Sequence, residues 1–107
     1  MRIIAKPALR GMARRHASER ARLESWARQI EGCSPPNAVA LRDALASFRP
    51  SPIPGNRMVF DISRNFRLIC GVRYDIQVVF VCWFGPHEAY DRIDAATASN
   101  YESFDER

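Results

Sequence analysis

The chain has 107 residues, which is about one domain, and this length excludes a multidomain assembly. Apolar residues make up 47% and charged residues 26%, a balance that predicts a globular protein and excludes an intrinsically disordered one. The net charge is +4, with 16 Lys and Arg, and a basic protein of this kind is expected to bind a polyanion.

The positive charge is concentrated in the first half of the chain, where Lys6 is the single lysine and the other cations are arginines. Arginine forms paired hydrogen bonds to phosphate and stacks on bases. A bias in genomic base composition would enrich arginine equally well, and the sequence leaves both explanations open.

The three cysteines, Cys33, Cys70 and Cys82, form no C-x-x-C pair and have no histidine at metal-ligand spacing. We expect reduced core thiols, and no metal or other cofactor. The longest apolar run, residues 78–84, is far shorter than the roughly 20 residues of a membrane span, and the N-terminal run is too short for a signal sequence. The sequence therefore predicts a cytoplasmic protein with no membrane partner.

The first predicted elements are a short strand and two helices. Residues 2–5 are partly β-branched and precede Pro7, which predicts an opening strand followed by a helix that runs to about Ala17. Ser18 is a natural N-cap for a second helix, which Gly32 ends. The apolar residues of this helix recur at helical spacing and predict a core-facing stripe of Leu23, Trp26, Ala27 and Ile30.

A third helix is predicted after two prolines, with Asn37 as its cap. Its apolar side is expected to consist of Val39, Leu41, Leu45 and Phe48. The proline-rich residues 49–55 cannot continue a helix and predict an extended, stiff connector.

From residue 57 the apolar residues alternate, which predicts a half-buried strand over residues 57–62 with its even-numbered residues facing the core. Tight turns lead to predicted strands over residues 66–73 and 76–84, a meander that Gly85 and Pro86 end. The last strand is apolar on both faces, so it is expected to lie centrally and to be covered by the helices. The predicted fold class is α+β, with N-terminal helices packed on a small antiparallel β-sheet.

After the last strand the composition becomes polar. Residues 87–91 predict a turn or a short helix on the rim of the sheet. Residues 97–107 are expected to form a polar, mobile tail, which leaves residues 1–96 as the single domain.

The residues after the last strand carry the clearest chemistry. His87, Tyr90 and Asp91 are close in sequence, and on a short helix positions i, i+3 and i+4 share one side. All three side chains transfer protons, and histidine does so near neutral pH. A helix-capping pair of His87 and Asp91 is the structural alternative.

Arginines on the neighbouring strands could bind phosphate beside His87. The candidates are Arg57 on the first strand, Arg67 and Arg73 on the second, and Arg64 in the turn between them. Such a group could cleave RNA without a metal, because a base takes the ribose 2′-OH proton, arginine stabilises the phosphorane and an acid protonates the leaving 5′-oxygen. Each arginine taken singly could equally lie on a solvated strand face.

No Walker A, dinucleotide-binding, serine-hydrolase or zinc-protease motif occurs in the sequence. A nucleotide-binding protein, a dehydrogenase and these two hydrolase classes therefore have no support.

Three segments, residues 55–62, 65–69 and 84–94, contain an N-x-R-L-I pattern and a G-x-H-x-x-Y-D signature. Together they resemble the HigB-type toxins of bacterial toxin–antitoxin modules, in the RelE/ParE superfamily. The resemblance extends to about Ala95. It implies a RelE-like α+β fold, metal-independent cleavage of mRNA, usually on the translating ribosome, and control by a cognate helix-turn-helix antitoxin.

Carried over position by position, the resemblance implies a catalytic group at the rim of the sheet. This group comprises Arg67 on the middle strand and His87, Tyr90 and Asp91 after the last strand. Arg57 is implied as a lesser contact to the RNA backbone.

The chain departs from these toxins at two positions near the signature. Trp83 stands where an arginine is typical, and Pro86 where a threonine is typical. Arg64 or Arg73 could supply the missing cation, and both are candidates for RNA binding. Trp83 itself could stack on a base or pack in the core.

Two other classes of function fit the same residues. A toxin of the ParE type, directed at a topoisomerase, would act by binding and without RNA cleavage. A basic RNA-binding module would use mainly the arginines of the N-terminal helices.

Overall fold

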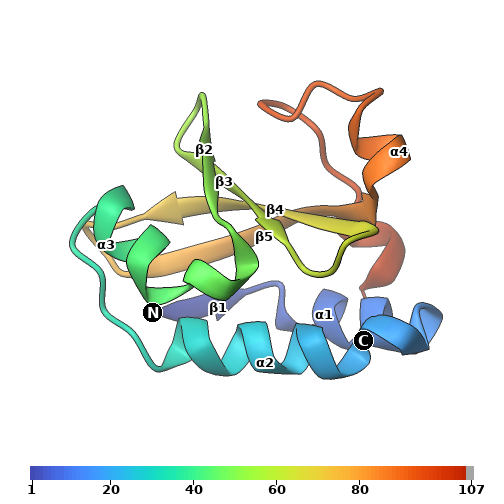
Figure 1. The fold of residues 1–107 in the computed structure, drawn as a ribbon, viewed down its shortest axis with the longest axis horizontal. Coiled ribbons are helices and arrows are strands. Elements are labelled where there is room, and N and C mark those ends of the chain that lie inside the picture. The colour runs from blue at the N-terminus through green and yellow to red at the C-terminus, as the bar shows by residue number, and fades with distance from the viewer. Residues whose placement is uncertain (106–107) are drawn as a thin grey trace.

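The predicted α+β class is confirmed over residues 1–105, which the computed structural model describes. The helices formed before residue 50 lie along one face of a five-stranded sheet (Figure 1). In spatial order its strands are β1 (Arg2–Ile4), β5 (Val78–Pro86), β4 (Phe66–Arg73), β3 (Arg57–Asp61) and β2 (Ser51–Ile53). No helix in this part of the chain is long and apolar enough to cross a membrane.

The first helix, α1 (Lys6–Arg15), follows β1 as predicted and has Pro7 in its first turn. A 3₁₀ turn, η1 (Ala17–Glu19), separates it from α2 (Arg20–Glu31). The prediction of Ser18 as the N-cap of α2 is therefore wrong, and its hydroxyl donates to Glu19 Oε2 instead.

The apolar stripe of α2 is confirmed, because Leu23, Trp26 and Ile30 are buried against the sheet. Trp26 packs edge-on against Phe60 of β3, with 5.3 Å between the ring centroids. Gly32 ends the helix, and its N–H donates to the carbonyl of Arg28.

The third predicted helix is divided in two. Asn37 caps α3 (Ala38–Ala44) as predicted, and its Oδ1 accepts from the N–H of Ala40 at 2.9 Å. The chain then tightens into η2 (Ala46–Phe48), and Val39 is 65% exposed rather than part of the apolar side.

The proline-rich connector contains β2, which pairs with β3 as an edge strand. Pro52 is tolerated there, because an edge strand can lack one N–H without losing a ladder hydrogen bond. Gly55 and Asn56 both have positive φ, 87° and 60°, and turn the chain into β3.

Strands β2 to β5 are antiparallel, but β1 joins β5 in parallel, so the sheet is mixed and not wholly antiparallel. β5 begins at Val78 rather than at residue 76 and continues through Gly85 and Pro86, because Phe66 at the start of β4 pairs with Pro86. The predicted stop at Gly85 was wrong for this reason.

Different segments of the chain pack on the two faces of the sheet. The predicted inward residues Met58, Phe60 and Ile62 pack in the large core with α1, α2 and α3. Val59 and Ile69 face the other side, where they pack with Trp83 and with residues that follow α4 (His87–Tyr90). We call residues 91–100 the C-terminal strap; with α4 they lie on the face opposite α1 and α2 (Figure 1). The helices thus cover one face of β5 and not both.

Residues 97–105 of the predicted tail pack against the rest of the chain, and residues 106 and 107 lie outside the described residues. The amide of Asn100 donates to and accepts from the backbone of Phe84, at 2.8 and 2.9 Å, where β1 is too short to pair with β5. Beyond it, η3 (Tyr101–Phe104) buries Phe104 against α1. Gly11 of α1 has no Cβ and so leaves room for the Phe104 carbonyl.

Candidate active surface

The rim of the sheet brings α4 beside the start of β4. Arg67 pairs with Gly85 in the β4–β5 register, two residues before His87. The backbone N–H of His87 donates to the carbonyl of Asn65 in the β3–β4 turn at 2.7 Å. We call His87, Tyr90, Asp91 and Arg67 the rim site, because these contacts hold α4 next to the strand that carries Arg67.

His87 and Asp91 face each other across one turn of α4. His87 Nδ1 lies 3.9 Å from Asp91 Oδ2, which is an ion-pair distance when the imidazole is protonated and too long for a hydrogen bond. Their side chains are 42% and 71% exposed. Both proton-transfer groups are therefore open to a substrate.

Tyr90 is half-buried and packs against the smaller second core, which consists of Val59, Ile69, Cys82 and Trp83. Its ring lies 6.2 Å from the ring of Trp83 on β5. Packing on one side limits the freedom of this side chain, which is the kind of restraint that positions a catalytic group.

Arg67 has a restrained guanidinium. Its Nε lies 3.0 Å from Asp61 Oδ1, and its Nη1 donates to the backbone carbonyls of Ser63, Arg64 and Phe66. The side chain is 21% exposed. Arg67 thus holds the β3–β4 turn in shape, while part of its side chain remains exposed to solvent.

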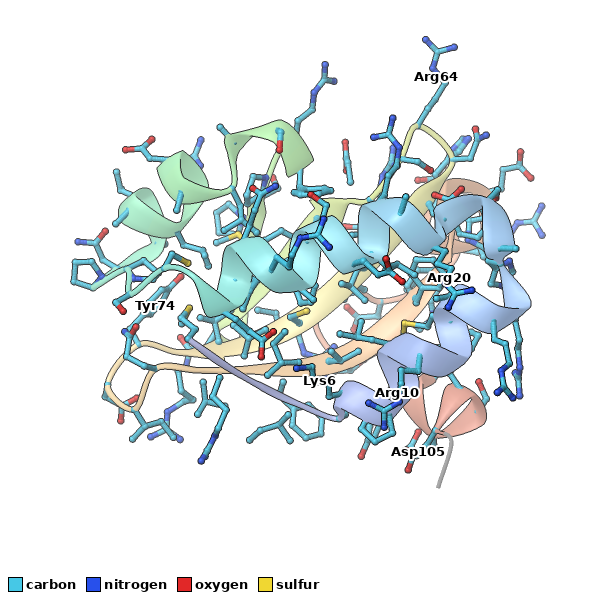
Figure 2. All side chains as sticks on the ribbon, turned by 90° about the horizontal axis from the view of Figure 1, so that it is seen from below. Lys6, Arg10, Arg20, Arg64, Tyr74 and Asp105 are labelled. Carbon is cyan, nitrogen blue, oxygen red and sulfur yellow. The ribbon has the colours of Figure 1, made fainter. Side chains whose placement is uncertain are left out.

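Arg64 stands at the tip of the β3–β4 turn. It is exposed and projects away from the body of the molecule (Figure 2). The structure thus places this predicted RNA-binding residue at the same end of the sheet as the rim site.

Arg57 is engaged with the protein itself. Its Nη1 donates to the carbonyls of Ala95 and Ala98, at 3.0 and 2.7 Å, and so ties the C-terminal strap to β3. Arg57, which was predicted to contact RNA, therefore stabilises the position of the C-terminal strap in this structure.

Trp83 is 6% exposed and packs with Val59 and Ile69 under α4. The β4–β5 register shifts between Ile69 and Cys70, which leaves Cys82 as an extra residue on β5. The bulge turns Cys82 and Trp83 to the same face, and the indole lies over Gly85. The sequence left base stacking and core packing as alternatives for Trp83, and the structure shows core packing.

Arg73 lies at the other end of β4, six residues from Arg67 and so about 20 Å along the strand. It forms an exposed pair with Asp75, with Nη2 to Oδ2 at 2.7 Å. A side-chain hydrogen bond from Arg73 lowers the pKa of the Asp75 carboxyl. The structure does not bring Arg73 together with the rim site.

A cleft of about 310 Å³ adjoins the rim site on the side of α2 and η2. We call it the basic cleft, and its lining is Arg22, Ser47, Arg49, Asp61, Ser63, Arg64 and Arg67. Sequence reasoning missed Arg22 and Arg49, because nothing but the general excess of arginine marks them in the sequence.

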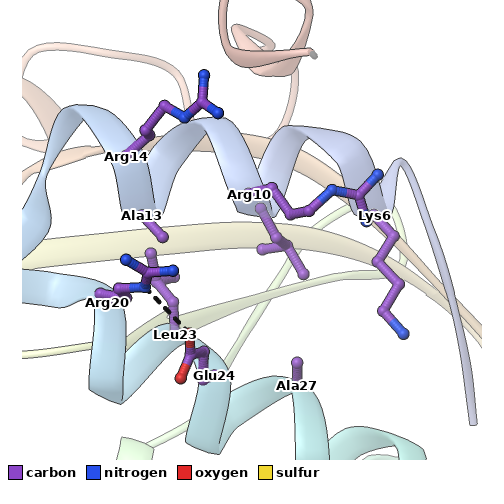
Figure 3. A pocket seen from close by; sticks show the side chains of 9 residues that line it. Lys6, Arg10, Ala13, Arg14, Arg20, Leu23, Glu24 and Ala27 are labelled. Carbon is purple, nitrogen blue, oxygen red and sulfur yellow. Dashed lines mark hydrogen bonds and ion pairs between the residues drawn. The ribbon is translucent and has the colours of Figure 1, made fainter. Parts of the chain in front are cut away.

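A larger groove of about 540 Å³ lies between α1 and α2 (Figure 3). Its lining combines apolar residues with basic ones: Leu9, Ala13, Leu23 and Ala27, and Lys6, Arg10, Arg14 and Arg20. Within it Arg20 is paired with Glu24, with Nε to Oε1 at 3.3 Å. None of the predicted site residues lines this groove.

Within residues 1–105 no three His, Cys, Asp or Glu side chains gather in a way that could hold a metal ion. The rim site contributes one histidine and one carboxylate from α4 and its C-terminal end, together with Arg67. This arrangement offers proton transfer and stabilisation of an anion.

Comparison with known proteins decides the family. The profile of HigB toxins, described as the RelE-like toxic component of a toxin–antitoxin system, matches residues 19–93, well over half of the chain. The chain belongs to the HigB toxin family. The match covers α2 through α4, including the whole rim site of this HigB toxin, and membership implies a cognate antitoxin as partner. A search of the curated proteins found no match.

Proposed function

We propose that this HigB toxin is an endoribonuclease that cleaves mRNA without a metal ion and so inhibits translation. The observation that carries the proposal is the rim site, where the side chains of His87 and Asp91 are 42% and 71% exposed and half-buried Tyr90 lies on the same short helix. The strand that carries Arg67 pairs with Gly85, two residues before His87. Family membership supports the toxin, and the chemistry of these side chains supports the reaction.

The reaction needs one base, one acid and one cation. A base at the rim takes the proton of the ribose 2′-OH, and the 2′-oxygen attacks the adjacent phosphorus. Arg67 stabilises the negative charge of the phosphorane, and an acid gives its proton to the leaving 5′-oxygen. The P–O5′ bond breaks, and the products are a 2′,3′-cyclic phosphate and a free 5′-hydroxyl.

Within this scheme His87 and Tyr90 are the proton-transfer groups, and Asp91 stabilises the protonated imidazole of His87 as an ion pair across the turn of α4. Arg67 is already held by Asp61 and three carbonyls, so it loses little side-chain entropy when it meets a phosphate. A pre-positioned guanidinium stabilises a transition state better than a freely rotating one.

The test is cleavage of RNA by the purified chain, with analysis of the product ends. We expect 2′,3′-cyclic phosphate ends or their opened products, and equal rates with and without EDTA. Loss of cleavage in EDTA that added metal restores would overturn the metal-independent mechanism.

The setting of the reaction can be tested by offering the same mRNA free and on translating ribosomes. We expect faster cleavage on the ribosome, and arrest of growth when the chain is expressed without an antitoxin. Growth arrest with intact mRNA would instead favour a toxin that acts by binding, as a ParE-type toxin does.

A further inference from the structure

The basic cleft has an unusual charge balance. Four arginines line it, and the single carboxylate is that of Asp61. Asp61 is already paired with Arg67, at 3.0 Å. Within residues 1–105, no carboxylate lies at ion-pair distance from Arg22, Arg49 or Arg64.

Each of these three arginines comes from a different element. Arg22 lies on α2, and its Nη1 reaches the carbonyl of Ile62 only at 3.5 Å. Arg49 follows η2 with φ of 45°, in the left-handed region that glycine occupies most readily. Arg64 is on the β3–β4 turn, so the tertiary fold alone assembles the cleft.

We propose that the basic cleft binds the phosphodiester backbone of the RNA strand beside the bond that the rim site cleaves. This inference rests on the proposed function, and it assigns Arg22 and Arg49 as phosphate contacts outside the catalytic group. Arg67 is shared by the cleft and the rim site, so a strand that leaves the scissile phosphate can continue directly into the cleft.

The lining favours a phosphate backbone over a protein partner. All seven side chains of the cleft are polar or charged, and none is aromatic or aliphatic. A docking peptide normally requires an apolar core at its interface, whereas phosphate is bound by guanidinium forks and serine hydroxyls. Without an aromatic platform the cleft contacts the backbone rather than the bases, so it adds affinity without sequence preference.

The experiment compares two double variants with equal loss of charge. Arg22→Gln with Arg49→Gln removes two cations from the cleft. Arg28→Gln with Arg42→Gln is the matched control, because it removes two exposed arginines from α2 and α3 that do not line the cleft. The probe is a single-stranded RNA with a 2′-deoxy residue at the scissile position, so that it binds without being cleaved.

We expect the cleft variant to bind the probe about tenfold more weakly for each arginine removed, and the control to bind nearly as wild type does. The plot of log K against log salt concentration should become shallower by about 1.4, because two phosphates of a single strand are no longer neutralised by the protein.

Equal weakening by both double variants would overturn the proposal, because the effect would then belong to the overall charge. Unchanged RNA affinity with loss of antitoxin binding would also overturn it and would assign the cleft to an acidic peptide. Since the probe reports binding alone, a chain that binds through the cleft and cleaves nothing would refute the nuclease and leave the cleft proposal standing.

Discussion

The two ends of β4 carry the same pair of residue types in different surroundings. At one end Arg67 and Asp61 are 21% and 32% exposed, and Arg67 also donates to three backbone carbonyls. At the other end Arg73 and Asp75 are 61% and 62% exposed and contact mainly each other. The first pair includes a rim-site residue and organises the β3–β4 turn, whereas the second is an ordinary surface ion pair.

The difference follows from register rather than from residue type. Arg67 and Arg73 are an even number of residues apart and so lie on the same face of the sheet. Arg67 pairs with Gly85, next to α4, whereas Arg73 pairs with Val78 beside the β4–β5 turn. An arginine on a strand can therefore be assigned to a site only when the strand's partner is known.

The largest expected difference between the two ends is catalytic. His87→Ala should lower the single-turnover cleavage rate by about 10²- to 10⁴-fold, because it removes a proton-transfer group that acts in the transition state. RNA affinity should change little. The measurement is single-turnover cleavage beside a binding titration.

Two tyrosines supply a matched pair for the same comparison. Tyr90→Phe and Tyr74→Phe each remove one hydroxyl from a half-buried ring, at the rim site and near the β4–β5 turn respectively. We expect a lower cleavage rate only for Tyr90→Phe. Wild-type rates for His87→Ala and Tyr90→Phe in folded protein would leave the rim site as a capping pair without catalytic function.

The next difference concerns stability. Arg67→Ala removes the bonds to three carbonyls and leaves Asp61 without its partner, so we expect a loss of about 1 to 3 kcal/mol together with weaker RNA binding. In a domain of this size each kcal/mol lowers the Tm by about 4 to 8 °C. Arg73→Ala should leave the Tm unchanged, and equal losses in thermal denaturation would contradict the comparison.

Two glycines of the sheet give a smaller contrast in packing. A Cβ on Gly85 would lie 2.7 Å from Cη2 of Trp83, so Gly85→Ala must displace the indole at a cost of about 1 to 3 kcal/mol. A Cβ on Gly71 would meet its nearest neighbours at 4.0 Å, so Gly71→Ala should be neutral or slightly stabilising. Chemical denaturation measures both, and a neutral Gly85→Ala would show that Trp83 moves freely.

The smallest effect is the pH dependence at the far end. The hydrogen bond from Arg73 lowers the pKa of Asp75 below its ordinary value of 3.8. Because the pKa of Asp75 is lower in the folded state, the pair stabilises the fold at any pH above the ordinary pKa of the carboxyl. This contribution is lost as the pH falls through the pKa of the folded state. Because both side chains are exposed, the effect should be visible only in the titration of Asp75 itself, followed by NMR. Arg73→Gln should raise the midpoint of that titration. An unchanged midpoint would show that the pair is not formed in solution.

Much of the fold was predictable because local spacing determines which face of an element is buried. Leu23, Trp26 and Ile30 recur at helical spacing and are buried, and residues 58, 60 and 62 alternate and face the helices. The side chain of Asn37 caps α3 for a purely local reason. The prediction of Ser18 failed because a 3₁₀ turn occupies the position where the cap was expected.

The candidate site was less predictable, because contacts between residues far apart in the sequence decide which side chains belong to it. His87, Tyr90 and Asp91 are close in sequence, so their common helix could be foreseen. The positions of Arg57 and Trp83 could not, because Arg57 binds carbonyls of the C-terminal strap and a β-bulge turns Trp83 into the second core. Arg22 and Arg49 meet the rim only through the packing of α2 and η2 on the sheet.

The sequence by itself determined the α+β class, the sheet-facing stripe of α2, the three long strands and the position of the proton-transfer signature, because these depend on spacings of a few residues. Only the tertiary structure decided that β1 joins β5 in parallel, that Asn100 and Phe104 bring the polar C-terminal residues onto the sheet, and that one end of β4 adjoins α4. These contacts join residues far apart in the chain, and their geometry is set by strand register and by the burial of two separate cores, for which the local pattern carries no information.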